Sequence, residues 1–313
     1  MSDMLYKEYL IHWLQRKQKL VKASTYANYS LKIMNHLYEG IGNVALKDLD
    51  EKTLQQQVFV WLEKGACQGG GGLKLKTVKD LVTLVRSSLR DAARENLRAN
   101  AALEIVYPRS YVVGEKEILT EADQRKLATY VFKHPTPHNI GILLALATGM
   151  RIGEICALRW EHIDLEQRTV IVRGTLARIY GRNAGGQSYN EVVISAPKTV
   201  RSLRTIPLTK KLCELLQQEQ VEVRNAYLLS GKKSFVEPSN YRSYFYKLTE
   251  RLGIKHINFH GLRHTFASSL IGKGVDCKTV SELLGHANVN LTFNIYVHSS
   301  LLQKRKAVEL LKY

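Results

Sequence analysis

The last quarter of the chain, residues 260–296, carries two groups of chemically active side chains at the outer ends of two apolar segments that glycines separate. Its polar groups are His260, Arg263 and His264 at the start, and His286 and Tyr296 at the finish. Apolar residues at helical spacing predict helices in such segments. We interpret the two ends as parts of one site, so a fold of this chain must bring them together.

The net charge points to a polyanionic partner. The 46 Lys and Arg residues exceed the 28 Asp and Glu residues, which gives a formal charge of +18. Residues 1–113 hold 17 basic and 11 acidic side chains, and residues 114–313 hold 29 and 17. Excess charge in both parts predicts double-stranded DNA held between two domains, although a basic chain can also be merely cationic. A chain of 313 residues is long enough for two cores.

The cysteines and the apolar runs bear on the compartment. The four cysteines show no CxxC spacing, which argues against a disulfide framework and a cysteine zinc site and fits a reducing cytosol. The N-terminus lacks a signal-peptide pattern, and no window holds eighteen consecutive apolar residues. We therefore expect a cytoplasmic, nucleoid-associated protein with no membrane partner.

Residues 1–104 predict a helical DNA-binding domain of about four helices, followed by a linker over residues 105–117 that contains Pro108 and Gly114. The last of these helices, near residues 76–97, has a basic stripe along it and its approach. We take its cations as candidate DNA contacts: Lys74, Lys76, Lys79, Arg86 and Arg90. A solvated helix face would give the same pattern.

Residues 118–313 predict a second domain that is mainly α with a small antiparallel β-sheet. Residues 139–160 read as two helices with a turn at Gly149, and Arg151 opens the second of them. Residues 168–207 are rich in β-branched side chains, which favours short strands, with Lys198 near a turn. Further helices are expected before the last one, at residues 301–311.

Six residues at the ends of apolar segments suit one chemistry: Arg151, Lys198, His260, Arg263, His286 and Tyr296. Neither a carboxylate cluster for a metal nor a GxxxxGK[ST] loop for a nucleotide accompanies them. Two guanidiniums can hold the oxygens of a phosphodiester, a tyrosine can attack the phosphorus, and a lysine or histidine can move the proton. A phosphotyrosyl ester conserves the bond energy, so we expect no cofactor.

A zinc site is the alternative for the histidines. His256, His260 and His264 follow i, i+4 spacing, which can bind zinc on a helix. However, Gly261 stands where the glutamate of HExxH would be, and the helix is expected to begin only near His260. For His264, a supporting role inside the helix is as plausible as a direct one.

Four blocks of the sequence resemble the motifs of tyrosine recombinases, the phage-type integrase family: ATGMRIGEICALRW, PKTVRSLRTIPL, HGLRHTFASSLIGKGV and LLGHANVNLTFNIYVH. The resemblance covers residues 120–298, and the helical domain before them resembles the family's core-binding domain. It implies a two-domain clamp around DNA.

The resemblance also implies a role for each site residue. Arg151 and Arg263 would clamp the scissile phosphate, and Lys198 would protonate the leaving 5′-hydroxyl. His260 and His286 would hydrogen-bond the phosphate and assist proton transfer. Tyr296 would be the nucleophile that forms a 3′-phosphotyrosyl link, and Glu154 of the RxGE pattern would be structural.

By the same resemblance, such enzymes act as homotetramers through a Holliday junction, with the helix at residues 301–311 packed on a neighbouring subunit. Accessory DNA-bending proteins would be further partners. The long hairpin loop around Tyr180 to Tyr189 is more similar to integrases of phages and conjugative transposons than to compact chromosome-dimer resolvases. We therefore expect a mobile-element integrase. The alternatives are a chromosome- or plasmid-dimer resolving recombinase, a type IB topoisomerase, and a DNA-binding protein without catalysis.

Overall fold

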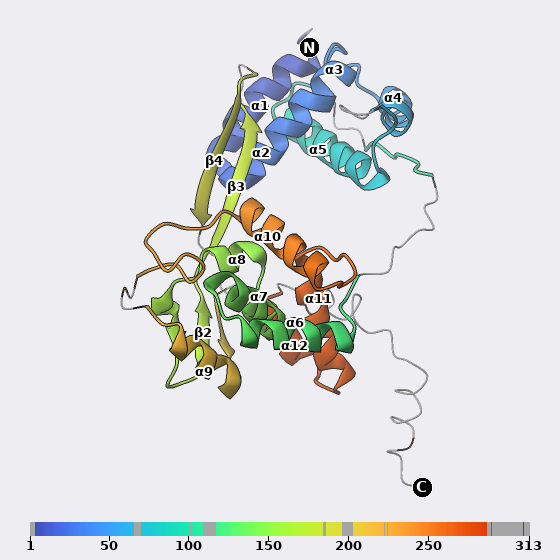
Figure 1. Cartoon of the computed structure of the whole chain (residues 1–313). Coiled ribbons are helices and arrows are strands. Elements are labelled where there is room, and N and C mark those ends of the chain that lie inside the picture. The colour runs from blue at the N-terminus through green and yellow to red at the C-terminus, as the bar shows by residue number, and fades with distance from the viewer. Residues whose placement is uncertain are drawn as a thin grey trace. The chain divides into compact units, whose positions relative to one another are not determined.

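The protein divides into two compact units in the computed structural model (Figure 1). Unit 1 comprises Met1–Gly114 and Ile179–Glu191, and unit 2 comprises Glu115–Arg178 and Val192–Tyr313. The structure describes residues 4–65, 70–99, 102–108, 117–183, 186–195, 203–221, 223, 225–286, 289 and 309. Lys198, Tyr296 and most of the predicted helix at 301–311 lie outside these residues.

Unit 1 is built from helices, as the sequence predicts. They are α1 (Tyr6–Leu20), α2 (Ala23–Lys32), a π-helical turn (Ile33–Leu37), α3 (Tyr38–Gly40), α4 (Glu51–Lys64) and α5 (Leu75–Arg94). Asp50 caps α4 by accepting a hydrogen bond from the Thr53 amide at 2.8 Å. The core contains the aromatic side chains of α1, the valines of α5 and its leucines Leu81, Leu84 and Leu89.

Polar side chains join α1 to α5 in this core and at its edge. The hydroxyl of Tyr6 lies 2.7 Å from that of Ser88, and both side chains are buried. Trp13 donates its indole N–H to Asp91 at 2.8 Å, and Lys17 pairs with the same carboxylate at 2.9 Å. Tyr6, Ser88 and Trp13 are buried, and Lys17 and Asp91 are half-buried. Each of these groups has a partner, so the contacts fix the register of the two helices.

Residues 102–108 lie along α4 and α5. Leu103 is buried in the core of unit 1, and its carbonyl accepts a hydrogen bond from the Arg86 Nε at 3.0 Å. The Gln55 side chain holds Val106 from both sides: it donates to the carbonyl at 3.1 Å and accepts from the amide at 2.9 Å. Part of the predicted linker, residues 105–108, is therefore tied to unit 1.

One two-stranded sheet has residues in both units. Its strands are β3 (Thr175–Arg182) and β4 (Ser188–Ser195), and residues 179–191 belong to unit 1. There the amide of Arg182 donates to the Ser30 hydroxyl at 3.1 Å, and Tyr189 packs against the apolar core.

Unit 2 is mainly helical with a small antiparallel sheet, which confirms the predicted fold class. Its helices are α6 (Glu121–Lys133), α7 (Pro137–Thr148), α8 (Ile152–Cys156), a 3-10 turn (Trp160–His162), α9 (Lys210–Gln218), α10 (Pro238–Arg251), α11 (His260–Gly272) and α12 (Cys277–Leu284). The three-stranded sheet has the order β1 (Ile163–Asp164), β2 (Thr169–Val172), β5 (Arg204–Pro207).

Helix α7 lies at the centre of unit 2. Its sequence is apolar on all sides, and residues 139–145 are buried, as expected for a helix covered by neighbours all round. Thr136 caps its start, and Pro137 occupies the first turn, where a missing N–H costs nothing. Helix α11 packs against α7, which brings the first turn of α11 to the turn that follows α7. Among the described residues, no helix combines the length and apolar character needed to span a membrane.

Candidate active site

The turn that ends α7 delivers Arg151 to the site. Gly149 ends the helix with a φ of 67°, a conformation that favours glycine. A Cβ at this position would meet Leu284 and Phe266, each at 2.7 Å. The backbone therefore passes close to α11 and α12 before it reaches Arg151, the N-cap residue of α8.

Arg263, in the first turn of α11, is 1% exposed. Its Nη1 donates to the Gly149 carbonyl at 2.8 Å and its Nη2 to the Leu284 carbonyl at 2.8 Å. These two carbonyls belong to the turn before Arg151 and to the end of α12. One guanidinium thus fixes two backbone segments, and each of them leads to another predicted site residue.

Glu154 holds Arg151 in place. Its carboxylate accepts the Arg151 backbone N–H at 2.8 Å and the Arg151 Nη1 at 2.8 Å. The side chain of Glu154 is 6% exposed, whereas that of Arg151 is 39% exposed. Buried Glu154 therefore holds Arg151 in position, and the exposed part of the Arg151 side chain is accessible to a ligand.

Arg204 is a member of this cluster that the sequence analysis missed. It pairs with both oxygens of Glu154, Nη1 to Oε1 at 3.1 Å and Nη2 to Oε2 at 2.8 Å, and its Nε donates to the Leu283 carbonyl at 2.8 Å. Burial alone would raise the pKa of the Glu154 carboxyl, but the hydrogen bonds and charge of Arg204, then the charge of Arg151, hold that pKa below its usual value. Glu154 is therefore ionised and structural, as its RxGE position implied.

His286 follows α12 by two residues. Gly285 ends that helix with a φ of 65°, and the His286 amide donates to the Ser281 carbonyl at 3.0 Å. The histidine is 9% exposed. Burial and then the charges of Arg263, Arg151 and Arg204 lower its pKa to about 3. Its ring is thus neutral near pH 7 and can donate one hydrogen bond while accepting another.

His260 and His264 lie one turn apart at the start of α11. His260 is exposed and His264 half-buried, and their ring centroids lie 4.7 Å apart in an edge-on arrangement. His256, the third histidine of the zinc alternative, packs its ring on Tyr246 instead, 4.8 Å between centroids. In the part of the chain that the structure describes, no group of three or more His, Cys, Asp or Glu side chains could hold a metal ion.

The structure brings four of the six predicted site residues together: Arg151, His260, Arg263 and His286. Lys198 and Tyr296 lie outside the described residues. Arg151 and Arg204 share the carboxylate of Glu154, and Arg263 donates to the carbonyls of Gly149 and Leu284. A neutral histidine beside several guanidiniums suits an oxyanion such as a phosphodiester.

The candidate DNA contacts of α5 differ in their surroundings. Lys74, Lys76, Lys79 and Arg90 are exposed. Lys79 lies over the ring of Tyr107, 5.2 Å from its centroid. Arg86 is half-buried because it bonds the Leu103 carbonyl. The exposed cations could meet a phosphate backbone, whereas Arg86 also has a structural task.

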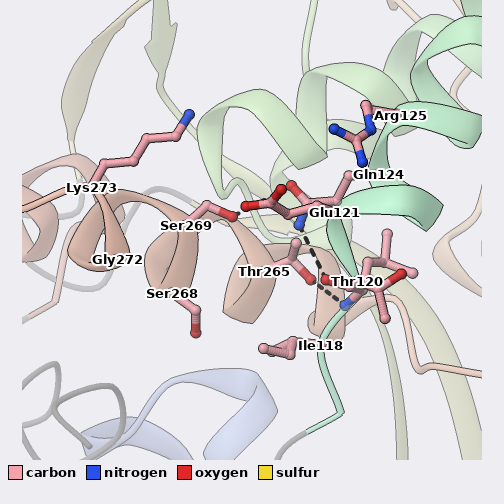
Figure 2. A pocket seen from close by; sticks show the side chains of 11 residues that line it. Ile118, Thr120, Glu121, Gln124, Arg125, Thr265, Ser268, Ser269, Gly272 and Lys273 are labelled. Atoms are coloured by element: carbon pink, nitrogen blue, oxygen red, sulfur yellow. Dashed lines mark hydrogen bonds between the residues drawn. The ribbon is translucent and has the colours of Figure 1, made fainter. Parts of the chain in front are cut away.

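A surface cavity of about 590 Å³ lies between the start of α6 and the later turns of α11. Figure 2 shows Thr265, Ser269 and Gln124 projecting toward one another there. The Thr265 hydroxyl accepts the Leu119 amide at 2.9 Å, and Gln124 donates to the Leu119 carbonyl at 3.1 Å. None of the predicted site residues lines this cavity, and its hydrogen bonds anchor α11 to the start of α6.

Comparisons with known proteins place these observations in a family. The model of the phage integrase family matches residues 116–302, and that of the phage integrase N-terminal SAM-like domain matches residues 5–60. A tyrosine recombinase XerC-like protein of Caldanaerobacter subterraneus is 30% identical over 77% of this chain and 66% of its own length. The transposase of transposon Tn916 from Enterococcus faecalis is 26% identical over 59% of this chain, but only 48% of its own length is covered.

Among solved structures, the Tn1549 transposon integrase in complex with a circular intermediate DNA is similar to this chain. The TM-score is 0.77, with 21% sequence identity, and the match covers 99% of this chain and 100% of that one. At this identity, the likeness concerns the fold. It extends over both units.

Proposed function

This chain belongs to the phage integrase family of tyrosine recombinases, enzymes that exchange DNA strands, and from that premise we propose that it is the site-specific recombinase of a mobile element. It cuts one DNA strand, holds the 3′ end as a phosphotyrosyl ester on Tyr296, and rejoins it to a strand of a second duplex. Two rounds of exchange pass through a Holliday junction.

The single observation that carries this proposal is the cluster around Arg263. Arg151 and Arg263 supply guanidiniums for the non-bridging oxygens of the scissile phosphate, and both are fixed beforehand by Glu154 and by backbone carbonyls. Donors fixed before the reaction stabilise the charge of a pentacoordinate transition state without reorganising. The neutral ring of His286 and the exposed ring of His260 complete the set of groups around the phosphate.

In the proposed reaction, the Tyr296 hydroxyl attacks phosphorus and the bond from phosphorus to the 5′-oxygen breaks. Lys198 gives its proton to that leaving oxygen, and a histidine accepts the proton of the tyrosine. The ester formed is again a phosphodiester, so the step reverses when a 5′-hydroxyl of another strand attacks. No energy source is needed for that exchange.

Two features support the choice of element and assembly. The Tn916 transposase among the relatives and the similar fold of the Tn1549 integrase support the mobile-element integrase, whereas the XerC-like relative at 30% identity keeps a dimer-resolving recombinase as the alternative. Each chain has one Tyr296, and exchange between two duplexes cuts four strands in all, so four subunits are required. The helix at residues 301–311 is the proposed link between neighbours, and DNA-bending proteins are proposed accessory partners.

The basic residues of α5 are proposed to bind the DNA backbone outside the cleavage position: Lys74, Lys76, Lys79, Arg86 and Arg90. Such contacts give affinity and position rather than sequence recognition. A DNA substrate would also place the protein on the nucleoid.

A covalent-adduct assay tests the proposal. The protein is mixed, without metal or ATP, with duplexes from the ends of its element that are nicked beside the cleavage position, so that the freed fragment diffuses away. We expect an SDS-resistant protein–DNA adduct whose DNA maps to Tyr296. Tyr296→Phe should abolish the adduct, whereas Tyr130→Phe, on the half-buried face of α6, should keep it.

Two results would contradict the proposal. An adduct that survives in Tyr296→Phe would mean another nucleophile, and no adduct on any end would favour a DNA-binding protein without catalysis. Relaxation of a supercoiled plasmid that lacks those ends would favour a type IB topoisomerase instead.

A further inference from the structure

Arg204 is a charged residue on the core side of a strand. Along β5, Arg204 and Ile206 are buried while Thr205 and Pro207 are exposed, so the arginine shares the inner face with an apolar residue. Its side chain is 5% exposed. A buried guanidinium is costly unless it is paired and hydrogen-bonded, so its partners indicate why it is there.

The first partner is the carboxylate that also holds Arg151. Oε1 of Glu154 accepts from the Nη1 of Arg151 at 2.8 Å and from the Nη1 of Arg204 at 3.1 Å. If Glu154 faced Arg151 alone, the two charges would cancel. Because Arg204 supplies a second positive charge to the same carboxylate, the charge of Arg151 remains available to an anion.

The second partner is the end of α12. The Arg204 Nε donates to the Leu283 carbonyl at 2.8 Å, and the next carbonyl, that of Leu284, accepts from Arg263 at 2.8 Å. Two arginines thus hold consecutive carbonyls directly before Gly285 and His286. A shift of Arg204 would therefore affect Arg151 through Glu154. It would also affect the backbone that leads to His286 through the Leu283 carbonyl.

Resting on the proposed function, we infer that Arg204 is a positioning residue for strand cleavage. It acts through Glu154 and the Leu283 carbonyl rather than by contacting DNA. It keeps the positive charge of Arg151 uncompensated and the end of α12 fixed. Loss of Arg204 should therefore slow cleavage of a charged phosphate more than cleavage of a neutral one. Loss of a merely structural residue should slow both equally.

The test compares two nicked duplexes that differ at the scissile position only. One carries the ordinary phosphodiester, and the other carries a methylphosphonate, which is neutral. Arg204→Met removes the positive charge and the Nη1 and Nη2 donors to Glu154 while keeping an unbranched side chain of similar length. Ile206→Ala is the matched control, because Ile206 lies on the same face of the same strand, is 1% exposed and has no charge.

We expect Arg204→Met to slow cleavage of the phosphodiester about tenfold or more, as for the loss of a charge-assisted contact in the transition state. Cleavage of the methylphosphonate should slow less than about threefold, since a neutral group gains little from the charge of Arg151. Ile206→Ala should affect both substrates equally. Arg204→Lys keeps the positive charge but not the paired guanidinium donors, so its rate of phosphodiester cleavage should lie between those of wild type and Arg204→Met.

Equal losses on the two substrates, in Arg204→Met as in Ile206→Ala, would overturn the inference. If circular dichroism shows Arg204→Met to be unfolded, the rate losses of Arg204→Lys on the two duplexes are compared instead. A selective loss on the phosphodiester supports positioning, and an equal loss on both duplexes refutes it. A wild-type protein that cleaves neither duplex would instead contradict the proposed function itself, which separates the two failures.

Discussion

The Nη1 of Arg263 lies 2.8 Å from the carbonyl oxygen of Gly149, a residue 114 positions earlier in the chain. This hydrogen bond joins the first turn of α11 to the turn that presents Arg151. The two guanidiniums proposed to hold one phosphate are therefore coupled through the backbone, and their separation depends on how closely that turn approaches α11.

Gly149→Ala should disturb this coupling. Alanine at a φ of 67° is strained, and its Cβ would lie 2.7 Å from Leu284 and Phe266, so these side chains must move. We expect the free energy of unfolding to fall by about 2–4 kcal/mol, strain and overpacking together, and covalent adduct formation to slow at a temperature where the variant is folded. Urea denaturation and the adduct assay measure the two effects.

Gly274→Ala is the matched control, because Gly274 also has a positive φ, 87°, but nothing lies within 4 Å of its Cβ position. It should show the strain of about 1–2 kcal/mol alone and keep normal cleavage. If the two variants lose the same stability, the turn at Gly149 does not lie as close to α12 as the structure has it.

His286 should make stability depend on pH. Its pKa is about 3 in the folded protein, below the ordinary 6.5, because of burial and the nearby arginines. Because the pKa of His286 is lower in the folded protein, the unfolded chain binds a proton at this histidine more readily. The free energy of unfolding is therefore unaffected by this histidine above pH 6.5 and falls progressively as the pH falls toward 3. Between pH 7 and 5.5, we expect a loss of about 1 kcal/mol from this residue.

The difference in unfolding free energy between wild type and His286→Gln, measured by urea denaturation across this pH range, isolates the effect. All other residues are the same in the two proteins, so the difference reports mainly on His286. Parallel stability curves for the two proteins would show that His286 is not held neutral.

How far the sequence could predict this site is clearest at Arg204. Arg151 and Arg263 were recognisable because each is a cation at the end of an apolar segment. Arg204 stands in the block PKTVRSLRTIPL, yet its role depends on Glu154, fifty positions away, and on the end of α12. The available signal was weak: an arginine two residues from a buried isoleucine on one strand, and an acidic residue in an otherwise apolar helix.

The fold class followed from periodicity, whereas two sets of tertiary contacts did not. Residues 105–108 lack helical periodicity and precede Gly114, so the pattern predicts a linker, but Leu103, Ile105 and Tyr107 alternate with exposed residues along a segment that packs in the core of unit 1. The hairpin tip, residues 179–191, groups with a part of the chain far away in sequence. Such contacts are tertiary and leave no local pattern.

Arg90 and Arg86 should behave differently in DNA binding. Arg90 is exposed, so Arg90→Ala should leave the free energy of unfolding within about 0.5 kcal/mol of wild type and reduce the slope of log affinity against log salt by about one. Arg86→Ala also loses the hydrogen bond to the Leu103 carbonyl, which should cost about 1–2 kcal/mol of stability. Fluorescence anisotropy over a salt series and urea denaturation give both quantities; an unchanged salt slope in Arg90→Ala would remove it from the DNA contacts.

The proposed role of Lys198 makes a prediction that depends on the leaving group. A general acid is needed because a 5′-alkoxide is a poor leaving group, and such acids contribute roughly 10²–10⁴-fold. Lys198→Ala should therefore slow adduct formation by about that factor on ordinary DNA. On a duplex with sulfur in place of the bridging 5′-oxygen, the thiolate leaves without a proton, so the same variant should react nearly as fast as wild type.

Arg151→Ala provides the contrast on these two duplexes, since a guanidinium that stabilises the non-bridging oxygens is needed whichever atom departs. Its loss should be similar with sulfur and with oxygen. If sulfur fails to restore Lys198→Ala, the lysine stabilises charge on the phosphate and does not deliver the proton. One of the two histidines, exposed His260 or buried His286, would then be the candidate acid. His286 is the weaker of the two, because a ring with a pKa of about 3 carries no proton to give as a cation near pH 7.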